Sequence, residues 1–521
     1  MDGRARPGHG GHRSAAYRRV RRRSVSLRAG ADDRRGGCAV ASAWRRPLGY
    51  PLRQVHACRL TVARTPTPWR RASLPPSRRT RHTVDYIALS RALHALGRTG
   101  EGGAVAPADR GLSAARRSRQ AAPYSTHEEF QTGASAMSEH ELTQEQRLIR
   151  ASVRAIAEKH FKPKAAEVDR TRRPPVEHIK TLAEAGFVGV FIPEEYGGPG
   201  RNLLDLVIVV EEVARCCANT AILVGCTDGA TPRAILHLGS AEQKKKYLPR
   251  IAKGELLCAW GMSEANAGSD IGNIQCKAVK DGDHYVINGA KLWCSGAQVS
   301  DMFLVLVRLD PAPGLRGVGA ILVERGTPGF SVGKHLDLIG FRGTGMAELV
   351  FEDCRVPAQN LMLPAGQMGK LLQVFNSDRI ATNPPICLGV AQAAFEAAVA
   401  YSKQRVQFRK PIAEQQGVQW KLADMAIDLE AARALLYRAA ARVDAGKGSA
   451  VDASITKVYV NEMSRRVTDT AMQLHGAFGL SEEFPMERMF RDVRGMSVGY
   501  GTTEIHRNLI GREILDGRYS A

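Results

Sequence analysis

The segment Ser263-Glu-Ala-Asn-Ala-Gly-Ser-Asp270 is followed closely by Asn288-Gly-Ala-Lys-Leu-Trp-Cys-Ser295, at the point where the sequence pattern changes from helix to strand. Small residues and hydroxyls dominate the first segment, and glycine allows the backbone to turn where other residues resist it. The second segment belongs to residues 284–293, which we interpret as two strands about an Asn288-Gly289 turn. A small β domain is therefore predicted between Ala259 and about Leu363. Its further strands are predicted at residues 302–307, 319–324 and 347–351, with a turn at 327–329.

Both flanks of this β domain have the three-and-four spacing of apolar residues that is typical of helices. On the N-terminal side the pattern covers residues 144–160 and 204–217, with a glycine-rich loop at 193–201 between them. The fold class is therefore α+β, with an N-terminal all-α domain, a small middle β domain and a C-terminal helical bundle. We place the domains at residues 137–257, 258–366 and 367–521.

The helical pattern of the C-terminal bundle returns from Gly369. Two consecutive prolines in Asn383-Pro384-Pro385 are expected to break or kink its first helix. The next helix is expected to end near Gly446, because glycine is common just after a helix. Its apolar face consists of Leu422, Met425, Leu429, Ala432 and Leu436, and two further helices are predicted at residues 451–474 and 503–515.

The first 136 residues differ sharply in charge from the rest. They hold 27 arginines, no lysine and 8 acidic residues, and they supply +19 of the net charge of +22. No hydrophobic periodicity accompanies this charge, so we expect a disordered extension. We interpret Met137 as the start of the protein; a long organellar transit peptide or a nucleic-acid-binding arm are the alternatives.

Several classes of protein do not fit the remaining sequence. Two of the ten cysteines, Cys38 and Cys58, lie in the extension, and the other eight are scattered without the spacing of a zinc site or a disulfide framework, so no metal is expected. The apolar run at residues 206–210 stops at Glu211 and Glu212, far short of the roughly 20 residues of a membrane span. Neither a Gly-x-Gly-x-x-Gly turn nor a P-loop occurs, which argues against a Rossmann nicotinamide fold.

The two opening segments resemble the paired signatures of the acyl-CoA dehydrogenase family, over about residues 137–521. That resemblance implies FAD as cofactor. Ser263 and Ser269 would hydrogen-bond the flavin and its ribityl-pyrophosphate arm, Trp293 would pack on the isoalloxazine, and Ser295 would approach its reactive edge. A planar apolar ring with polar edges suits one aromatic neighbour and a few convergent donors. The wider set implied at the cofactor includes Met262, Gly268, Thr502 and Glu504.

A second set lies in the helical bundle. Gln404-Arg-Val-Gln-Phe408 resembles the family's Arg-x-x-Phe element, and Gln473-Leu-His-Gly-Ala-Phe-Gly479 resembles its Gln-x-x-Gly-Gly-x-Gly element. The resemblance implies that Arg405, Phe408, Gln473 and Gly476 bind the FAD of a neighbouring subunit, in a homodimer or homotetramer. Arginine suits a pyrophosphate because its planar fork donates two parallel hydrogen bonds. Arg409 and Ala477 replace glycines that are usual in the family.

Oxidising an acyl thioester requires a carboxylate that removes the α-proton while the β-hydride passes to flavin N5. Many family members have Glu immediately before Gly-Thr near the C-terminus, where this chain has Tyr500, and a phenol of pKa about 10 is a poor base. Other members place the base directly before an arginine in the first helix of the bundle, where this chain has Asp378 before Arg379. Asp378 is therefore our candidate base, with Glu504 as the fallback. Arg379 would contact CoA or pair with Asp378, and Ser269 and Tyr500 would also contact substrate.

The resemblance implies a dehydrogenase that forms an enoyl-CoA from an acyl-CoA and passes electrons to an electron-transfer flavoprotein. Two alternatives stay open, a related CoA-thioester flavoenzyme with desulfinase-like or oxidase-like chemistry and a catalytically silent subunit of a hetero-oligomer. Neither nucleic acid nor a membrane is expected as a partner once the extension is set aside. We expect a cytoplasmic protein, or a mitochondrial matrix protein if the extension is a transit peptide.

Overall fold

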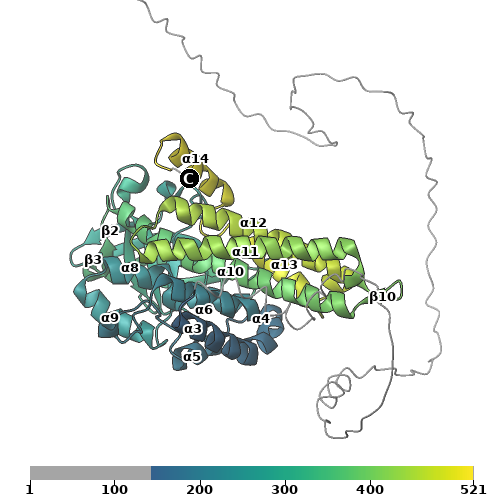
Figure 1. The fold of residues 1–521 in the computed structure, drawn as a ribbon. Coiled ribbons are helices and arrows are strands. Elements are labelled where there is room, and N and C mark those ends of the chain that lie inside the picture. The colour runs from purple at the N-terminus through teal and green to yellow at the C-terminus, as the bar shows by residue number, and fades with distance from the viewer. Residues whose placement is uncertain (1–141, 520–521) are drawn as a thin grey trace, which may run out of the picture. The chain divides into compact units, whose positions relative to one another are not determined.

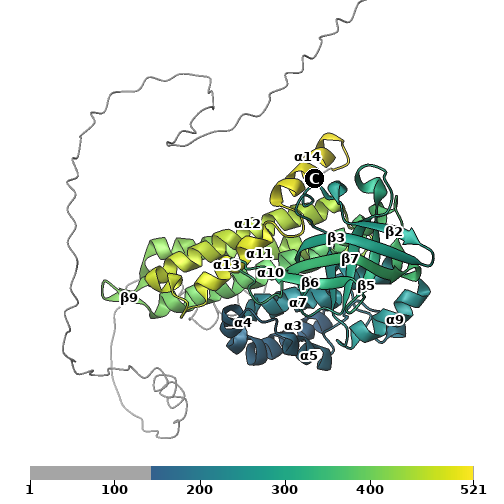
Figure 2. The ribbon, with the colours of Figure 1, turned by 180° about the vertical axis from the view of Figure 1, so that it is seen from behind.

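The chain builds three layers in sequence order: helices, a sheet and a second set of helices (Figure 1). The computed structural model describes residues 142–519, so the expectations for the extension and for Met137 lie outside the described residues. Figure 2 shows the sheet lying beside both helical groups. The predicted order of helices, β domain and helical bundle is confirmed.

The N-terminal helices begin at capping residues that the sequence supplies. The Thr143 side chain accepts a hydrogen bond from the Gln146 amide, while the Gln146 side chain accepts one from the Thr143 amide. Ser240 and Gln243 repeat this arrangement at the last helix of the group. The helices are α3 Gln144–Ile156, α4 Ala165–Thr171, α5 Val176–Glu184, α6 Leu203–Cys216, α7 Ala218–Asp228, α8 Ala230–Leu238 and α9 Ala241–Ala252, with a π-helical turn Ala157–Phe161 after α3.

The middle layer is one eight-stranded sheet with the order β6-β7-β3-β2-β4-β5-β8, and β1 pairs with β4. Strands β4 and β5 are buried on all but their last residue, because helices cover one face and a second apolar cluster fills the other. The strands are β1 Cys258–Gly261, β2 Lys277–Asp281, β3 His284–Cys294, β4 Met302–Arg308, β5 Val318–Glu324, β6 Phe330–His335, β7 Ala347–Pro357 and β8 Leu361–Leu363.

The prediction of two strands about Asn288-Gly289 is wrong, because β3 runs without a turn from His284 to Cys294. It pairs with β2 on one side and β7 on the other, and a shift in register at Gly289 marks a bulge rather than a hairpin. Gly289 has a φ of 138°, and a Cβ there would come within 2.8 Å of the Cys276 backbone. The Asn288 side chain spans the strand pair, bonding the Asp353 amide and carboxylate. Asn288-Gly289 therefore forms a β-bulge within β3 instead of a hairpin turn.

The C-terminal layer is a bundle around one long helix, α10, which packs against α6, α11 and α12. By length and composition alone, α10 is the one helix among residues 142–519 that could cross a bilayer, yet more than half of its most apolar stretch is buried within the protein. The elements are α10 Met368–Gln404, β9 Val406–Gln407, β10 Lys410–Pro411, α11 Gln416–Asp444, α12 Ala450–His475, α13 Met486–Met496 and α14 Thr503–Leu515.

The expected break at Asn383-Pro384-Pro385 does not occur. Helix α10 continues through both prolines. An interior proline costs a helix about 3 kcal/mol through its missing N–H and its clash with the preceding turn. Burial on all sides of this stretch holds it in place. The Asn383 side chain also donates to the Met496 carbonyl and accepts from Asn461, so neighbouring helices fix this turn.

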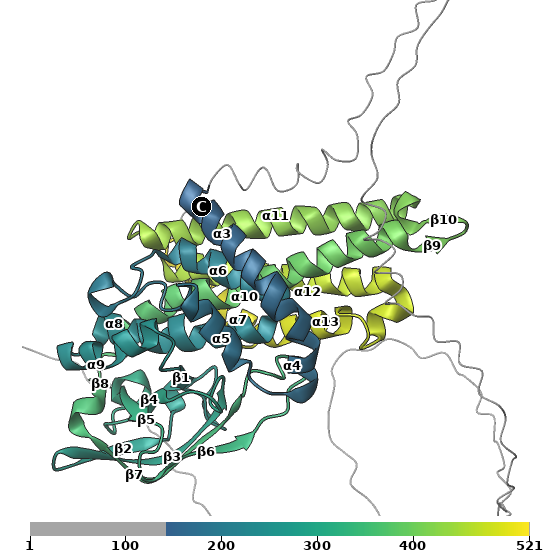
Figure 3. The ribbon, with the colours of Figure 1, turned by 90° about the horizontal axis from the view of Figure 1, so that it is seen from below.

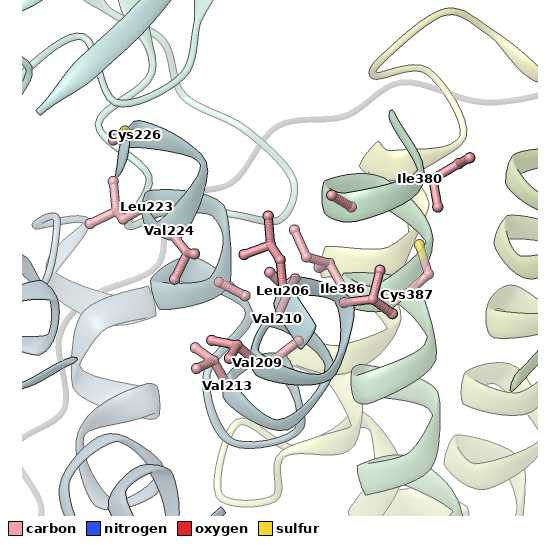
Figure 4. Close-up of a cluster of buried hydrophobic side chains, with 14 of the residues drawn as sticks. Leu206, Val209, Val210, Val213, Leu223, Val224, Cys226, Ile380, Ile386 and Cys387 are labelled. Carbon is pink, nitrogen blue, oxygen red and sulfur yellow. The ribbon is translucent and has the colours of Figure 1, made fainter. Parts of the chain in front are cut away.

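The main apolar core lies where α6, α7 and α10 meet (Figure 4). Leu206 and Val210 of α6 point toward Ile386 of α10, while Leu223 of α7 lies on the other side of the cluster. These side chains are buried, and each contributes roughly 1.5–3 kcal/mol by leaving water. The core therefore fixes α10 rigidly against the N-terminal helices, which matters because α10 carries Asp378.

Candidate active site

A tight loop after β1 carries the first set of predicted cofactor residues. The Glu264 amide donates to the Ala267 carbonyl, and the Glu264 carboxylate accepts hydrogen bonds from the Gln275 and Cys276 amides. The buried Lys291 on β3 completes the anchor, with its Nζ 2.6 Å from Glu264 Oε1. These contacts of Glu264 hold the loop against the sheet.

The predicted cofactor residues of the loop are more accessible than Glu264 and its partners. Met262 and Ser263 are half-buried, and Gly268 and Ser269 are exposed.

Trp293 lies on β3 beside this loop and is not a core residue. Its side chain is 55% exposed, and its φ of 61° is uncommon for any residue other than glycine. A register shift between Lys291 and Cys294 accompanies this conformation. Ser295 follows directly and is half-buried. A strained backbone that presents a large aromatic ring to solvent is typical of ligand-binding sites.

These residues fit a flavin in their chemistry. The loop offers hydroxyls and flexible backbone, and Trp293 offers an apolar face next to them. Trp260 on β1 adds a buried indole Nε1 without a hydrogen-bond partner among the described residues, which leaves one donor for a ligand. An indole N–H buried without a partner is costly, so a bound acceptor accounts for it.

The second predicted set lies elsewhere in the chain. Arg405 and Phe408 belong to the β9–β10 hairpin, which Figure 3 shows at the end of the bundle away from the sheet. Gln473 and Gly476 end α12 near that hairpin, since the Arg405 guanidinium lies 5.9 Å from the ring of Phe478. All four are exposed, Phe408 to 91%. Within one chain, the residues of each predicted set lie close together, but the second set lies far from the flavin loop and Trp293.

Asp378 lies in α10 with its side chain fully buried, and neither carboxylate oxygen has a hydrogen-bond partner among residues 142–519. Burial raises its pKa from 3.8 to about 7, against the opposing effect of the positive charges on Arg233 and Arg379. Buried carboxylates in proteins are nearly always paired or hydrogen-bonded. An unpaired one with a pKa near neutrality has the properties of a general base.

Arg379 does not neutralise Asp378. Its Nε donates to the Tyr500 carbonyl at 3.1 Å and its Nη1 donates to Asn376 Oδ1 at 2.7 Å. Its guanidinium also lies 5.2 Å from the centre of the Phe375 ring. Burial lowers the pKa of Arg379 to about 10, so it stays charged at neutral pH. Two nitrogens of Arg379 are thus engaged by groups other than Asp378, and the described residues show no ion pair between Arg379 and Asp378.

Tyr500 packs beside this turn of α10. It stacks on Phe375 at 5.5 Å, and Phe375 stacks in turn on Trp260 at 4.9 Å, so an aromatic column links the bundle to the sheet. Removal from water and the negative charge of Asp378 raise the pKa of Tyr500 above its ordinary value, which leaves the phenol neutral. The backbone φ of Tyr500 is 62°, and its carbonyl oxygen lies 3.0 Å from Nε2 of His506.

The fallback carboxylate is in a different environment. Thr502 caps α14 by accepting a hydrogen bond from the Ile505 amide, and Glu504 is exposed in the first turn of that helix. Hydrogen bonds from its own amide and neighbouring hydroxyls lower the pKa of Glu504. An exposed, readily ionised carboxylate lacks the features of a tuned base, so Asp378 is the better candidate.

Four residues of the site were not found from the sequence: Trp260, Phe375, Lys291 and Arg233. The first three carry no local signal, because aromatic and charged residues on strands and helices are common. Arg233 did carry one, since it is the only charged residue in the apolar run Ala-Thr-Pro-Arg-Ala-Ile-Leu of α8.

The fold and this site define a three-domain flavin-dependent oxidoreductase. Models of the acyl-CoA dehydrogenase N-terminal, middle and C-terminal domains match residues 143–255, 259–354 and 370–515. The chain is 41% identical over 377 residues to acryloyl-CoA reductase (NADH) of Anaerotignum propionicum, across 72% of this chain and 95% of the relative. It belongs to the acyl-CoA dehydrogenase family, and its cofactor is FAD.

Two solved structures are similar to this one. Butyryl-CoA dehydrogenase from Megasphaera elsdenii matches with a TM-score of 0.70 and 36% identity, across 72% of this chain and 99% of that one. A chain in a structure of the electron transferring flavoprotein of Acidaminococcus fermentans matches with the same TM-score, identity and coverage. The unmatched part of this chain contains the arginine-rich first residues.

Proposed function

We propose that this protein oxidises an acyl-CoA thioester to the enoyl-CoA, with Asp378 as the base that removes the α-proton. The observation that carries the proposal is the Asp378 carboxylate, which is fully buried and unpaired, with a pKa raised to about 7. A general base works best when its pKa lies near the operating pH. Burial also removes competing water, which strengthens the interaction of the carboxylate with a substrate C–H.

The other residues of the site hold and orient the reactants. The loop with Ser263 and Ser269, together with Trp293 and Ser295, binds the flavin in its own subunit. When bound, FAD accepts the hydride from the β carbon. Asp378 holds the abstracted proton, and Arg379 keeps the turn that carries Asp378 fixed to the Tyr500 carbonyl.

The exposed second set supports an oligomer. Arg405, Phe408, Gln473 and Gly476 lie away from their own chain's flavin loop and would contact the FAD of a neighbouring subunit, in a homodimer or homotetramer. The exposed ring of Phe408 favours contact with another surface.

We further propose an electron-transfer flavoprotein as the electron acceptor and the cytoplasm as the compartment. The likeness to a chain in an electron transferring flavoprotein structure supports that acceptor, while the likeness to an NADH-dependent reductase makes NADH the competing redox partner.

The test is turnover of purified protein begun at Met137, with straight-chain and branched acyl-CoAs and an artificial electron acceptor, followed by identification of the product. Formation of an enoyl-CoA is expected with at least one neutral or charged acyl group. Release of sulfite from a sulfinyl thioester, or hydrogen peroxide without acceptor, would support the desulfinase-like or oxidase-like alternative. A flavin that no acyl-CoA reduces would overturn the proposal and favour a catalytically silent subunit.

A further inference from the structure

Arg233 is a buried cation that the proposed proton abstraction does not use. It lies in α8 with its side chain only 6% exposed. Its Nε and Nη1 atoms are buried without a hydrogen-bond partner among residues 142–519. Removing a guanidinium from water is costly unless something pairs with it, so a ligand is the expected partner.

The neighbours of Arg233 orient it without pairing with it. Its guanidinium lies over the Phe191 ring at 4.7 Å, a cation–π contact that restricts its movement. Asp228 keeps Phe191 in place, because its carboxylate accepts hydrogen bonds from the Gly189 and Val190 amides. Arg233 is therefore held in a rigid frame rather than free to turn toward solvent.

Three carboxylates influence Arg233 electrostatically, and none forms an ion pair with it among the described residues. Asp228 is engaged with the backbone of the preceding loop, and Asp444 accepts the Leu203 and Leu204 amides. The third, Asp378, has no engagement at all and exerts the largest of the three effects. α8 packs directly on α10, which carries Asp378. The unpaired donors of Arg233 and the unpaired oxygens of Asp378 therefore belong to one interior region.

A purely hydrocarbon acyl group would gain nothing from this arrangement. It would bury apolar atoms against a desolvated guanidinium, whereas apolar side chains lining the same place would bind it better. The helix offers such residues directly after Arg233, since Ala234 and Ile235 are completely buried. A cation among them is suited to an acyl group that carries an acceptor of its own.

We propose that Arg233 binds a carboxylate at the distal end of the acyl group, so that the enzyme prefers a dicarboxylic acyl-CoA over the neutral acyl-CoA of the same length. This inference rests on the proposed function, with Asp378 acting at the α carbon. The planar guanidinium fork matches a carboxylate with two parallel hydrogen bonds. It also shields the substrate carboxylate from the charge on Asp378.

The competing explanation is that Arg233 acts only on Asp378, as a positioning residue that tunes its charge. The two explanations differ in their dependence on substrate. A positioning residue affects neutral and carboxylated acyl groups alike, whereas a binding residue affects only the carboxylated group. Paired substrates therefore separate them.

The experiment compares glutaryl-, adipyl- and pimeloyl-CoA with pentanoyl-, hexanoyl- and heptanoyl-CoA, using flavin-loaded wild type, Arg233→Met and Arg233→Lys. Wild type is expected to prefer one dicarboxylic substrate by about 30-fold or more in kcat/KM, the effect of one buried charged pair. Arg233→Met should lose that preference and improve with the neutral partner. Arg233→Lys, which keeps the charge but not the fork, should retain part of it.

Each outcome decides the matter. A wild type that oxidises only neutral acyl-CoAs, or an Arg233→Met variant that loses activity equally with both members of a pair, overturns the inference and leaves the proposed function standing. If no acyl-CoA reduces the flavin, the proposed function fails. In that case, calorimetric binding of the same substrate pairs to the wild type tests the role of Arg233 separately. Equal affinities for the dicarboxylic and the neutral acyl-CoA of each pair would overturn the inference. Flavin content and melting temperature establish that the variants are folded.

Discussion

Replacing Asp378 with Asn should stabilise the folded protein while it removes the base. The carboxyl is completely buried without a partner, and its pKa rises from 3.8 to about 7 on folding. Because the folded-state pKa is the higher one, ionisation opposes folding: the cost is absent below about pH 4 and complete above about pH 7. Three pKa units at about 1.4 kcal/mol each give roughly 4 kcal/mol as the upper limit.

Asn has nearly the shape of Asp and never ionises, so the variant avoids this cost. Its amide still lacks partners, which reduces the expected gain at about pH 8 to about 2–4 kcal/mol. For a chain of this size, about 1–2 °C of melting temperature corresponds to 1 kcal/mol, so the gain is about 2–8 °C. Near pH 5 the gain should be well under half as large, because the native Asp378 is then protonated and only its ionisation in the unfolded chain between about pH 4 and pH 5 still contributes.

The assay is thermal unfolding of the flavin-loaded proteins at both pH values, with flavin content measured in each sample. Glu504→Gln is the matched control, since its carboxylate is exposed and its loss should change the melting temperature little. An Asp378→Asn protein that melts at or below the wild-type temperature near pH 8, or whose gain is the same at both pH values, would refute the reasoning.

Three further predictions follow from the same structure. The rate of flavin reduction by acyl-CoA, followed by anaerobic stopped flow, should rise about tenfold per pH unit up to about pH 7 and then level off as Asp378 loses its proton; a flat profile would contradict this. Arg409→Gly should stabilise the β9–β10 turn by about 1 kcal/mol in thermal unfolding, because Arg409 has a φ of 69°, and a lower melting temperature would count against it. Arg405→Ala should reduce the ratio of FAD to protein after gel filtration, with Arg405→Lys restoring part of it; full retention by the Ala variant would remove Arg405 from the cofactor site.

The fold was predictable from the sequence because helix and strand periods differ and change at two clear places. The errors arose where tertiary packing overrides local preference. Two adjacent prolines usually end a helix, yet α10 continues through them because α6 and α12 enclose it. Asn288-Gly289 usually turns a hairpin, yet it forms a bulge because β3 has a partner strand on either side.

The site was predictable only where residues form a motif. Asp378 directly before Arg379 could be found in this way, but the direction in which Arg379 points could not, because its partner is a carbonyl 121 residues away. Trp293 was predictable as a flavin contact through its segment, whereas its exposure depends on the bulge in β3. Arg233 becomes interpretable only when α8 and α10 are seen in contact.

The most direct test of the role of Asp378 is anaerobic flavin bleaching by a single acyl-CoA in wild type and Asp378→Asn, with both proteins fully loaded with flavin and shown to bind the acyl-CoA. The wild type is expected to bleach. The variant should bleach at least about 100-fold more slowly, the usual contribution of a general base, while Glu504→Gln should match the wild type. Equal bleaching by Asp378→Asn and wild type, or loss of bleaching in Glu504→Gln alone, would contradict the assignment of Asp378 as the base.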